Sequence, residues 1–144
     1  PKVIEFNCRM GDPETQVVLP LMAESLLEPL LAVARGASLD GWRPAAPSRA
    51  ALTTVLVSEG YPGTPAIGRP IELPADLEDS DLHVYHAGTR LDGDELVTAG
   101  GRVFAVTGIG PDPHAAARRS REGAERIVFE GADWRRDIGR SDAG

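Results

Sequence analysis

Three polar residues at alternate positions near the start of the chain have the side chains that phosphoryl-transfer chemistry requires. Glu5, Asn7 and Arg9 lie in the stretch EFNCRMGDPETQ. Alternate residues of a strand project from one face, so we expect all three to point the same way. A carboxylate beside a carboxamide oxygen suits Mg²⁺, which takes one or two protein ligands together with phosphate oxygens. The pattern predicts a metal-nucleotide site, and an edge strand with a solvated polar face is the alternative.

The elements that must position these residues are a strand and a series of short helices. The β-branched residues before Glu5 predict a strand over Pro1–Phe6, with Phe6 facing a core. Asp12 and Pro13 have the types preferred for the N-cap and the first position of a helix. Apolar residues then recur at helical spacing as far as Ala34, and the prolines at positions 20 and 29 predict two or three short helices. Gly36 is a plausible C-cap.

The second part of the chain has a different texture, typical of a small α+β domain that is mostly antiparallel. Strands are expected over 50–58, 82–87 and 102–110, with 95–100 pairing to the last of these through Gly100-Gly101. A helix of roughly fifteen residues should begin at Asp112-Pro113, and the tail DWRRDIG could add a strand. We therefore divide the chain into residues 1–37, a linker at 38–48 and a domain at 49–144.

Composition limits the classes of function. The 144 residues carry a net charge of −7, which gives no reason to expect nucleic acid as a partner. The single cysteine excludes an intrachain disulfide and suits the cytoplasm, and no apolar run approaches the length of a membrane span. The chain opens with Pro rather than Met, and its Leu-rich helical face must pack on something. We expect that an upstream portion is absent and that this face belongs against it.

Five motifs in order give the chain a specific resemblance. EFNCRMGDPETQVVLPLM is similar to the last motif of the ATP-grasp domain of the glycinamide ribonucleotide synthetases, also called phosphoribosylamine–glycine ligases. VLVSEGYPG, HAGT, GGRVFAVTGIG and FEGADWRRDIG resemble the C-terminal domain of the same family, so the likeness covers nearly the whole chain. Departures are Trp134 in place of Tyr, Met10 in place of Phe, and an unfamiliar RSDAG at the C-terminus.

The resemblance implies the C-terminal end of an ATP-grasp domain followed by that family's C-terminal domain. It implies a ligase that joins glycine to 5-phosphoribosylamine with ATP, through a glycyl phosphate, in purine biosynthesis. The products are glycinamide ribonucleotide, ADP and phosphate. The upstream domains of the same enzyme supply most nucleotide contacts, so the segment alone is expected to be inactive. No glycine-rich phosphate loop occurs here, and Lys2 is the only lysine.

The same resemblance assigns roles to individual residues. Glu5 and Asn7 match the family's ligands for Mg²⁺ or Mn²⁺, and Arg9 matches the arginine that follows them, with a catalytic role inferred near the acyl phosphate. Asp12 could face the attacking amine, although a helix cap would explain it equally well. Arg135 or Arg136 could hold the ribose 5-phosphate; as strand neighbours they face opposite ways, so only one can do so. A surface charge cluster neutralised by Asp137 is the alternative.

Other tempting residues have simpler explanations. His83 and His86 should face opposite sides of a strand and cannot chelate one ion together, so a hydrogen-bonding role is favoured for His86. The stretch EGYPGT is better explained as a tight turn than as a phosphate cradle, and Cys8 as a small core residue. Two rival functions remain: another ATP-grasp ligase or carboxylase, and a folded module without catalysis.

Overall fold

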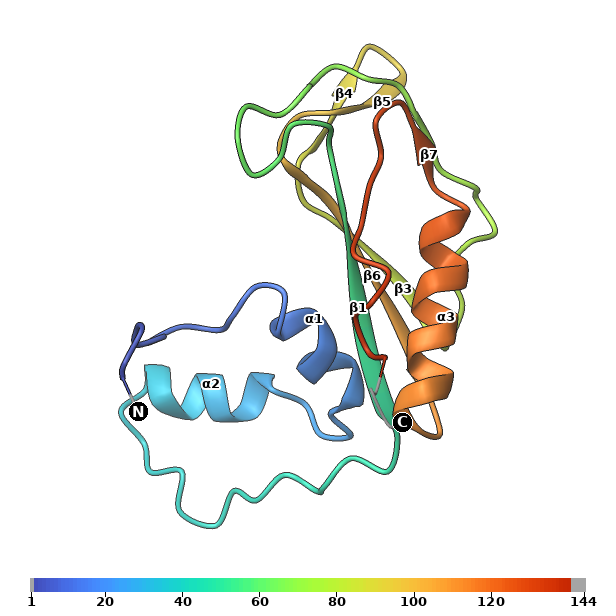
Figure 1. Ribbon diagram of the computed structural model, residues 1–144. Helices are drawn as coiled ribbons and strands as arrows, with labels where there is room; N and C mark the ends of the chain where they lie inside the picture. The colour runs from blue at the N-terminus through green and yellow to red at the C-terminus, as the bar shows by residue number, and fades with distance from the viewer. Residues whose placement is uncertain (1, 141–144) are drawn as a thin grey trace.

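A three-stranded antiparallel sheet organises the C-terminal part of the computed structural model, which describes residues 2–140 (Figure 1). Strand β6 (Arg102–Gly110) lies in the middle, with β1 (Ala50–Val57) on one side and β3 (Leu82–His86) on the other. Every residue of β6 after Arg102 is buried, as expected for a central strand covered on both faces. The predicted α+β class and these three strands are confirmed.

Helix α3 (Pro113–Glu125) covers one face of this sheet (Figure 1). The helix begins as predicted, because the Asp112 carboxylate accepts a hydrogen bond from the Ala115 backbone N–H at 2.8 Å. Small residues on its inner side let the helix backbone come close to β6. The hydroxyls of Thr54 and Ser120 lie 2.6 Å apart across the contact, so the few buried polar groups there are satisfied. The apolar core between helix and sheet is built from residues Leu56, Ile71, Leu77, Leu82, Val84, Val103, Phe104, Val106, Ala124, Ile127 and Phe129.

Two short antiparallel strand pairs complete the C-terminal part. Strand β2 (Ile71–Glu72) pairs with β7 (Val128–Phe129), and β4 (Thr89–Asp92) pairs with β5 (Glu95–Thr98). The predicted pairing of 95–100 with β6 is therefore wrong. The chain turns instead at Gly93-Asp94, the two-residue loop between β4 and β5, where Gly93 has a φ of 62°.

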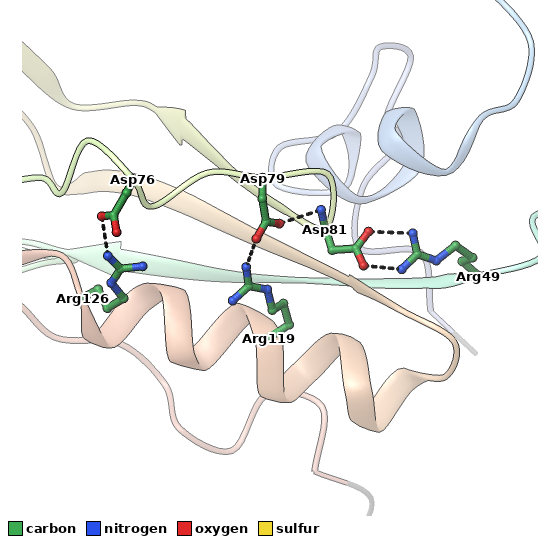
Figure 2. A network of polar contacts seen from close by, with 6 residues as sticks. All are labelled: Arg49, Asp76, Asp79, Asp81, Arg119 and Arg126. Atoms are coloured by element: carbon green, nitrogen blue, oxygen red, sulfur yellow. Dashed lines mark hydrogen bonds and ion pairs between the residues drawn. The ribbon is translucent and has the colours of Figure 1, made fainter.

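Ion pairs attach the segment between β2 and β3 to its surroundings (Figure 2). The three pairs shown are Arg49–Asp81, Arg119–Asp79 and Arg126–Asp76. Arg49 binds Asp81 with two parallel N–H donors at 2.7 and 2.8 Å, and this hydrogen bonding lowers the pKa of the Asp81 carboxyl. The Asp79 pKa is lowered mainly by a hydrogen bond from the Asp81 backbone N–H, and then by Arg119.

The N-terminal part forms three short helices, as its prolines predict. They are α1 (Thr15–Val18), the 3₁₀ helix η1 (Leu19–Leu21) and α2 (Leu27–Ala34). Gly36 follows α2 with a φ of 65°, which confirms the predicted C-cap. Helices α1 and η1 pack against the face of the sheet opposite α3, whereas α2 lies further from it (Figure 1).

Several expectations for the N-terminal part are wrong. Residues 2–8 form no strand, because no described strand lies beside them to pair with their backbone groups. Phe6 is 84% exposed instead of facing a core, and Cys8 is exposed as well. Asp12 is not the helix N-cap, since α1 begins at Thr15 and the Asp12 carboxylate has other partners.

Two further features concern helix α2 and the C-terminal tail. The Leu-rich face of α2 is exposed, with residues Leu27, Leu30, Leu31 and Val33 between 42 and 69% accessible. The strand expected in the tail DWRRDIG is also absent among the described residues: only Asp133 bridges β1, through two backbone hydrogen bonds with Val57 at 2.8 and 3.1 Å. Within residues 2–140, no helix combines the length and apolar character that crossing a membrane requires.

Candidate active site

Glu5 and Asn7 lie side by side although their backbone is not a strand. The Asn7 side-chain amide donates a hydrogen bond to Glu5 Oε1 at 3.2 Å, and both residues are exposed. Because the oxygen and nitrogen of a carboxamide exchange by a half-turn, the Asn7 oxygen can be presented beside the Glu5 carboxylate. The arrangement therefore offers a pair of hard oxygen ligands at one place on the surface.

These two ligands fit a magnesium-type ion held partly by phosphate. Among residues 2–140, no group of three or more His, Cys, Asp or Glu side chains is placed to hold a metal by itself. Mg²⁺ commonly takes one or two protein oxygens and completes its shell with water and substrate phosphate. The Glu5–Asn7 pair matches that requirement and no more, so an ion there would need a phosphate ligand as well.

Arg9 is not joined to this pair. Its guanidinium donates to the Met10 backbone carbonyl at 2.9 Å and remains exposed. The structure thus brings two of the three predicted residues into contact and leaves the arginine nearby on the chain with a weak local partner.

Asp12 connects the opening stretch to the β-sheet. One carboxylate oxygen, Oδ1, accepts a hydrogen bond from the Gln16 side chain at 2.9 Å. The other, Oδ2, forms an ion pair with Arg102 at 3.0 Å, and Arg102 also donates to the Asp12 backbone carbonyl at 3.2 Å. Residue 102 begins β6, so this carboxylate fixes the loop after Glu5 and Asn7 against the central strand.

A cavity of about 530 Å³ lies beside this ion pair, on the face of the sheet opposite α3. Arg102 and Arg135 both contribute to its wall, and Tyr61 and Trp134 supply aromatic surface. Its floor is β1, whose alternate residues face it because side chains alternate along a strand. The full lining consists of Pro13, Thr53, Val55, Val57, Tyr61, Arg102, Asp133, Trp134, Arg135 and Ile138.

The two arginines of the tail face different surroundings. Arg135 lines the cavity and binds Asp137 with two N–H donors at 3.1 and 2.5 Å, which raises the Arg135 pKa and lowers the Asp137 pKa. Arg136 is outside the cavity lining: it pairs with Asp133 at 3.3 Å and stacks over the Trp134 ring at 4.5 Å. The two neighbouring arginines thus face different surroundings, although the cause is a turn and not the predicted strand.

The remaining tempting residues have structural roles. The His86 Nδ1 lies 2.9 Å from the Thr89 hydroxyl, and the ring packs edge-on against Phe104, in agreement with a hydrogen-bonding role. Residues 59–64 form turns, as expected for EGYPGT. The residue that sequence reasoning missed is Arg102, because its motif was used only for likeness and its partner Asp12 lies 90 positions away.

Comparison with known proteins places this fold in one class. The structure matches the crystal structure of a phosphoribosylamine–glycine ligase from Thermotoga maritima with a TM-score of 0.82 and 36% identity, over 95% of this chain and 33% of that one. The chain therefore has the fold of the C-terminal region of that class of ligase.

The sequence gives the family directly. Residues 51–141 match the family described as phosphoribosylglycinamide synthetase, C domain, and the chain belongs to this family. It is 44% identical to the phosphoribosylamine–glycine ligase of Chlorobaculum tepidum over 144 residues, covering 96% of this chain and 33% of that protein. It is also 44% identical to the trifunctional purine biosynthetic protein adenosine-3 of Gallus gallus, covering 14% of that longer protein. The chain thus spans about 33% of the single-activity ligases that it resembles.

Proposed function

We propose that this chain is the C-terminal portion of an ATP-dependent ligase that joins glycine to 5-phosphoribosylamine. The observation that carries the proposal is the connection of two parts: the opening stretch that carries the Glu5–Asn7 pair is attached at Asp12, by an ion pair, to Arg102 in the wall of the 530 Å³ cavity. Identity of 43–44% to the phosphoribosylamine–glycine ligases runs through both parts and covers 96% of the chain. A ligase needs such a junction, because the activated acid and the amine must meet.

The proposed reaction has two steps. In the first, a glycine carboxylate oxygen attacks the γ-phosphorus of ATP, the bond to the bridging oxygen breaks, and glycyl phosphate and ADP result. In the second, the amine of 5-phosphoribosylamine attacks the acyl carbon, phosphate leaves with the former carboxylate oxygen, and the nitrogen loses a proton to give the amide of glycinamide ribonucleotide.

The opening stretch would serve the first step. Glu5 and Asn7 would hold Mg²⁺ or Mn²⁺ together with the ATP phosphates, and a bound ion would supply charge neutralisation for the transferring phosphoryl group. Arg9, freed from the Met10 carbonyl, would bind an oxygen of the acyl phosphate. Asp12 would face the attacking amine and accept its proton, because its ion pair with Arg102 holds it beside the cavity that Arg102 lines.

The cavity would receive the phosphoribosyl group in the second step. Arg135 lines it and is the better placed of the two tail arginines to hold the 5-phosphate. Arg136 would act indirectly, by stacking on Trp134 and keeping that ring against the cavity. This choice between two neighbouring arginines can be tested by substitution.

The proposal includes the organisation around the site. Residues 1–37 would close an ATP-grasp domain, 38–48 would connect it, and 49–144 would form the C-terminal domain. The upstream domains of the same enzyme would supply the remaining nucleotide contacts, so these 144 residues would not turn over alone. A cytoplasmic location belongs to the same proposal, because a chain with one free cysteine suits reducing conditions.

A chimera provides the test. Residues 1–144 replace the matching C-terminal region of the Chlorobaculum tepidum ligase, and ADP formation is measured with glycine, 5-phosphoribosylamine, ATP and Mg²⁺. We expect turnover that requires both glycine and the amine. Glu5→Gln or Asn7→Ala should lower kcat by at least roughly 100-fold, because even second-shell partners of a metal are commonly worth 10- to 100-fold.

The matched control is Glu28→Gln, which makes the same chemical change at an exposed carboxylate on α2 and should leave kcat unchanged. ADP formation that does not depend on glycine and the amine, in a folded chimera, would be hydrolysis of ATP and would contradict the proposed substrates. Complete absence of turnover in that chimera would favour a module without catalysis.

A further inference from the structure

Arg102 occupies a position between the opening stretch and the cavity. It is the first residue of β6 and lies opposite Val57 of β1, so its side chain leaves the sheet on the cavity face. The same side chain reaches Asp12, with contacts at 3.0 Å to the carboxylate and 3.2 Å to the backbone carbonyl. One guanidinium thus touches both parts of the proposed site.

The Arg102 guanidinium has N–H donors that its contacts with Asp12 do not use. An arginine side chain carries five N–H donors in a planar fork. In the described part of the chain, the Arg102 side chain uses its two terminal nitrogens on Asp12 and makes no other hydrogen bond or ion pair. Its side chain is 41% exposed, so the remaining donors can still reach a ligand in the cavity.

The cavity has the size and lining expected for a sugar phosphate. Its volume of about 530 Å³ falls within the range of sites for small molecules. Tyr61 and Trp134 offer flat apolar surface, and Arg135 lines the cavity together with Arg102. Arginine is also the side chain best suited to bind a phosphate through two donors.

We propose that Arg102 binds the phosphate of the sugar-phosphate substrate in this cavity and is shared with Asp12, so that substrate binding and the Asp12 carboxylate are energetically coupled. The inference rests on the proposed function for the identity of the substrate. A phosphate that draws on Arg102 competes with Asp12 for the same guanidinium. Occupation of the cavity would therefore loosen the Asp12 ion pair.

Binding of ribose 5-phosphate to the 144-residue chain tests the inference without turnover. This probe carries the same pentose and phosphate as the substrate and lacks the amine. Trp134 lines the cavity and the chain has one other tryptophan, so in a Trp42→Phe background the fluorescence of Trp134 reports occupancy. Arg102→Met should raise the Kd at least about tenfold, as the loss of a charge-assisted hydrogen bond predicts. Ribose without phosphate should bind far more weakly than the probe.

A double-mutant cycle measures the coupling between Asp12 and the binding of phosphate by Arg102. Asp12→Asn removes the competing charge and should lower the Kd about threefold when Arg102 is present. In the Arg102→Met background the same change should have little effect, since only direct repulsion between Asp12 and the phosphate then remains. The control is Arg126→Met, whose side chain is 44% exposed and ion-paired to Asp76 far from the cavity; it should leave the Kd unchanged.

Two kinds of result would overturn the inference in variants whose circular dichroism shows a native fold. One is a Kd for Arg102→Met equal to that of the parent chain, or equal binding of ribose and ribose 5-phosphate. The other is an Asp12→Asn effect of the same size in both backgrounds. The chimeric ligase distinguishes this inference from the proposed function. Failure of turnover refutes the reaction. Turnover with an unchanged KM for 5-phosphoribosylamine in Arg102→Met refutes the role of Arg102 alone.

Discussion

At Gly108, helix α3 comes close to the central strand β6. A Cβ atom added at this position would lie 2.3 Å from the Ser120 backbone N and 2.5 Å from the Ala116 backbone O. Ordinary contacts begin near 3.4 Å, so the helix would have to move by roughly 1 Å. Both obstructing atoms belong to the backbone, which cannot rotate away as a side chain could. We therefore expect Gly108→Ala to force α3 off the sheet.

The cost can be worked out from what that movement disturbs. Inserting a methyl group into a packed interior typically costs about 1–3 kcal/mol. The Ser120 hydroxyl also donates to the Val106 carbonyl at 2.8 Å and lies 2.6 Å from the Thr54 hydroxyl, and weakening such bonds adds about 1 kcal/mol. The free energy of unfolding should fall by about 2–4 kcal/mol. For a chain of this size the thermal midpoint should fall by roughly 5–15 °C.

Urea denaturation followed by far-UV circular dichroism measures this difference directly. Gly63→Ala is the control, because its added Cβ would meet only the Gly60 carbonyl at 3.1 Å in an exposed turn. The control should change the free energy of unfolding by less than about 1 kcal/mol. A loss below about 0.5 kcal/mol for Gly108→Ala would refute the close approach of α3 to β6 and the packing argument built on it.

Three further predictions concern the tail, the ion pairs and the helix cap. In the chimeric ligase, Arg135→Ala should raise the KM for 5-phosphoribosylamine at least about tenfold without changing the KM for ATP, and Arg136→Ala should change it less; equal effects would contradict the assignment. Because Arg49 lowers the folded-state pKa of Asp81, the stability that this pair adds is present above the ordinary value of 3.8 and is lost as pH falls through the lowered pKa. Urea midpoints of the parent and Arg49→Met should therefore differ at neutral pH and converge as the pH falls through the lowered pKa of Asp81, and a constant difference would be inconsistent with the pair. Asp112→Ala should cost about 1 kcal/mol in the same assay by removing the cap of α3, whereas no loss would exclude a capping role.

The fold was predictable where local patterns and tertiary pairing agree. The buried run of β6 and the Asp112-Pro113 helix start are strong local signals, and both are observed. The pairing of β5 was missed because two glycine turns compete in that region. The Gly93 turn closes a two-residue hairpin, while Gly100-Gly101 leads from β5 toward β6 without pairing them. Choosing between such turns requires knowledge of the rest of the sheet.

In the candidate site, contacts between residues close in sequence could be predicted, and contacts between distant residues could not. The adjacency of Glu5 and Asn7 follows from their spacing of two residues and survives the loss of the predicted strand, because their own hydrogen bond keeps them together. No local spacing could place Arg102 beside Asp12, since the contact forms only when the opening loop folds against the edge of the central sheet. The resemblance in motifs included the segments of both Asp12 and Arg102 but gave no reason to expect a contact between them. An ion pair across 90 residues supplies that reason, and it makes Asp12 a connection between the opening stretch and the cavity wall where the sequence suggested a helix cap.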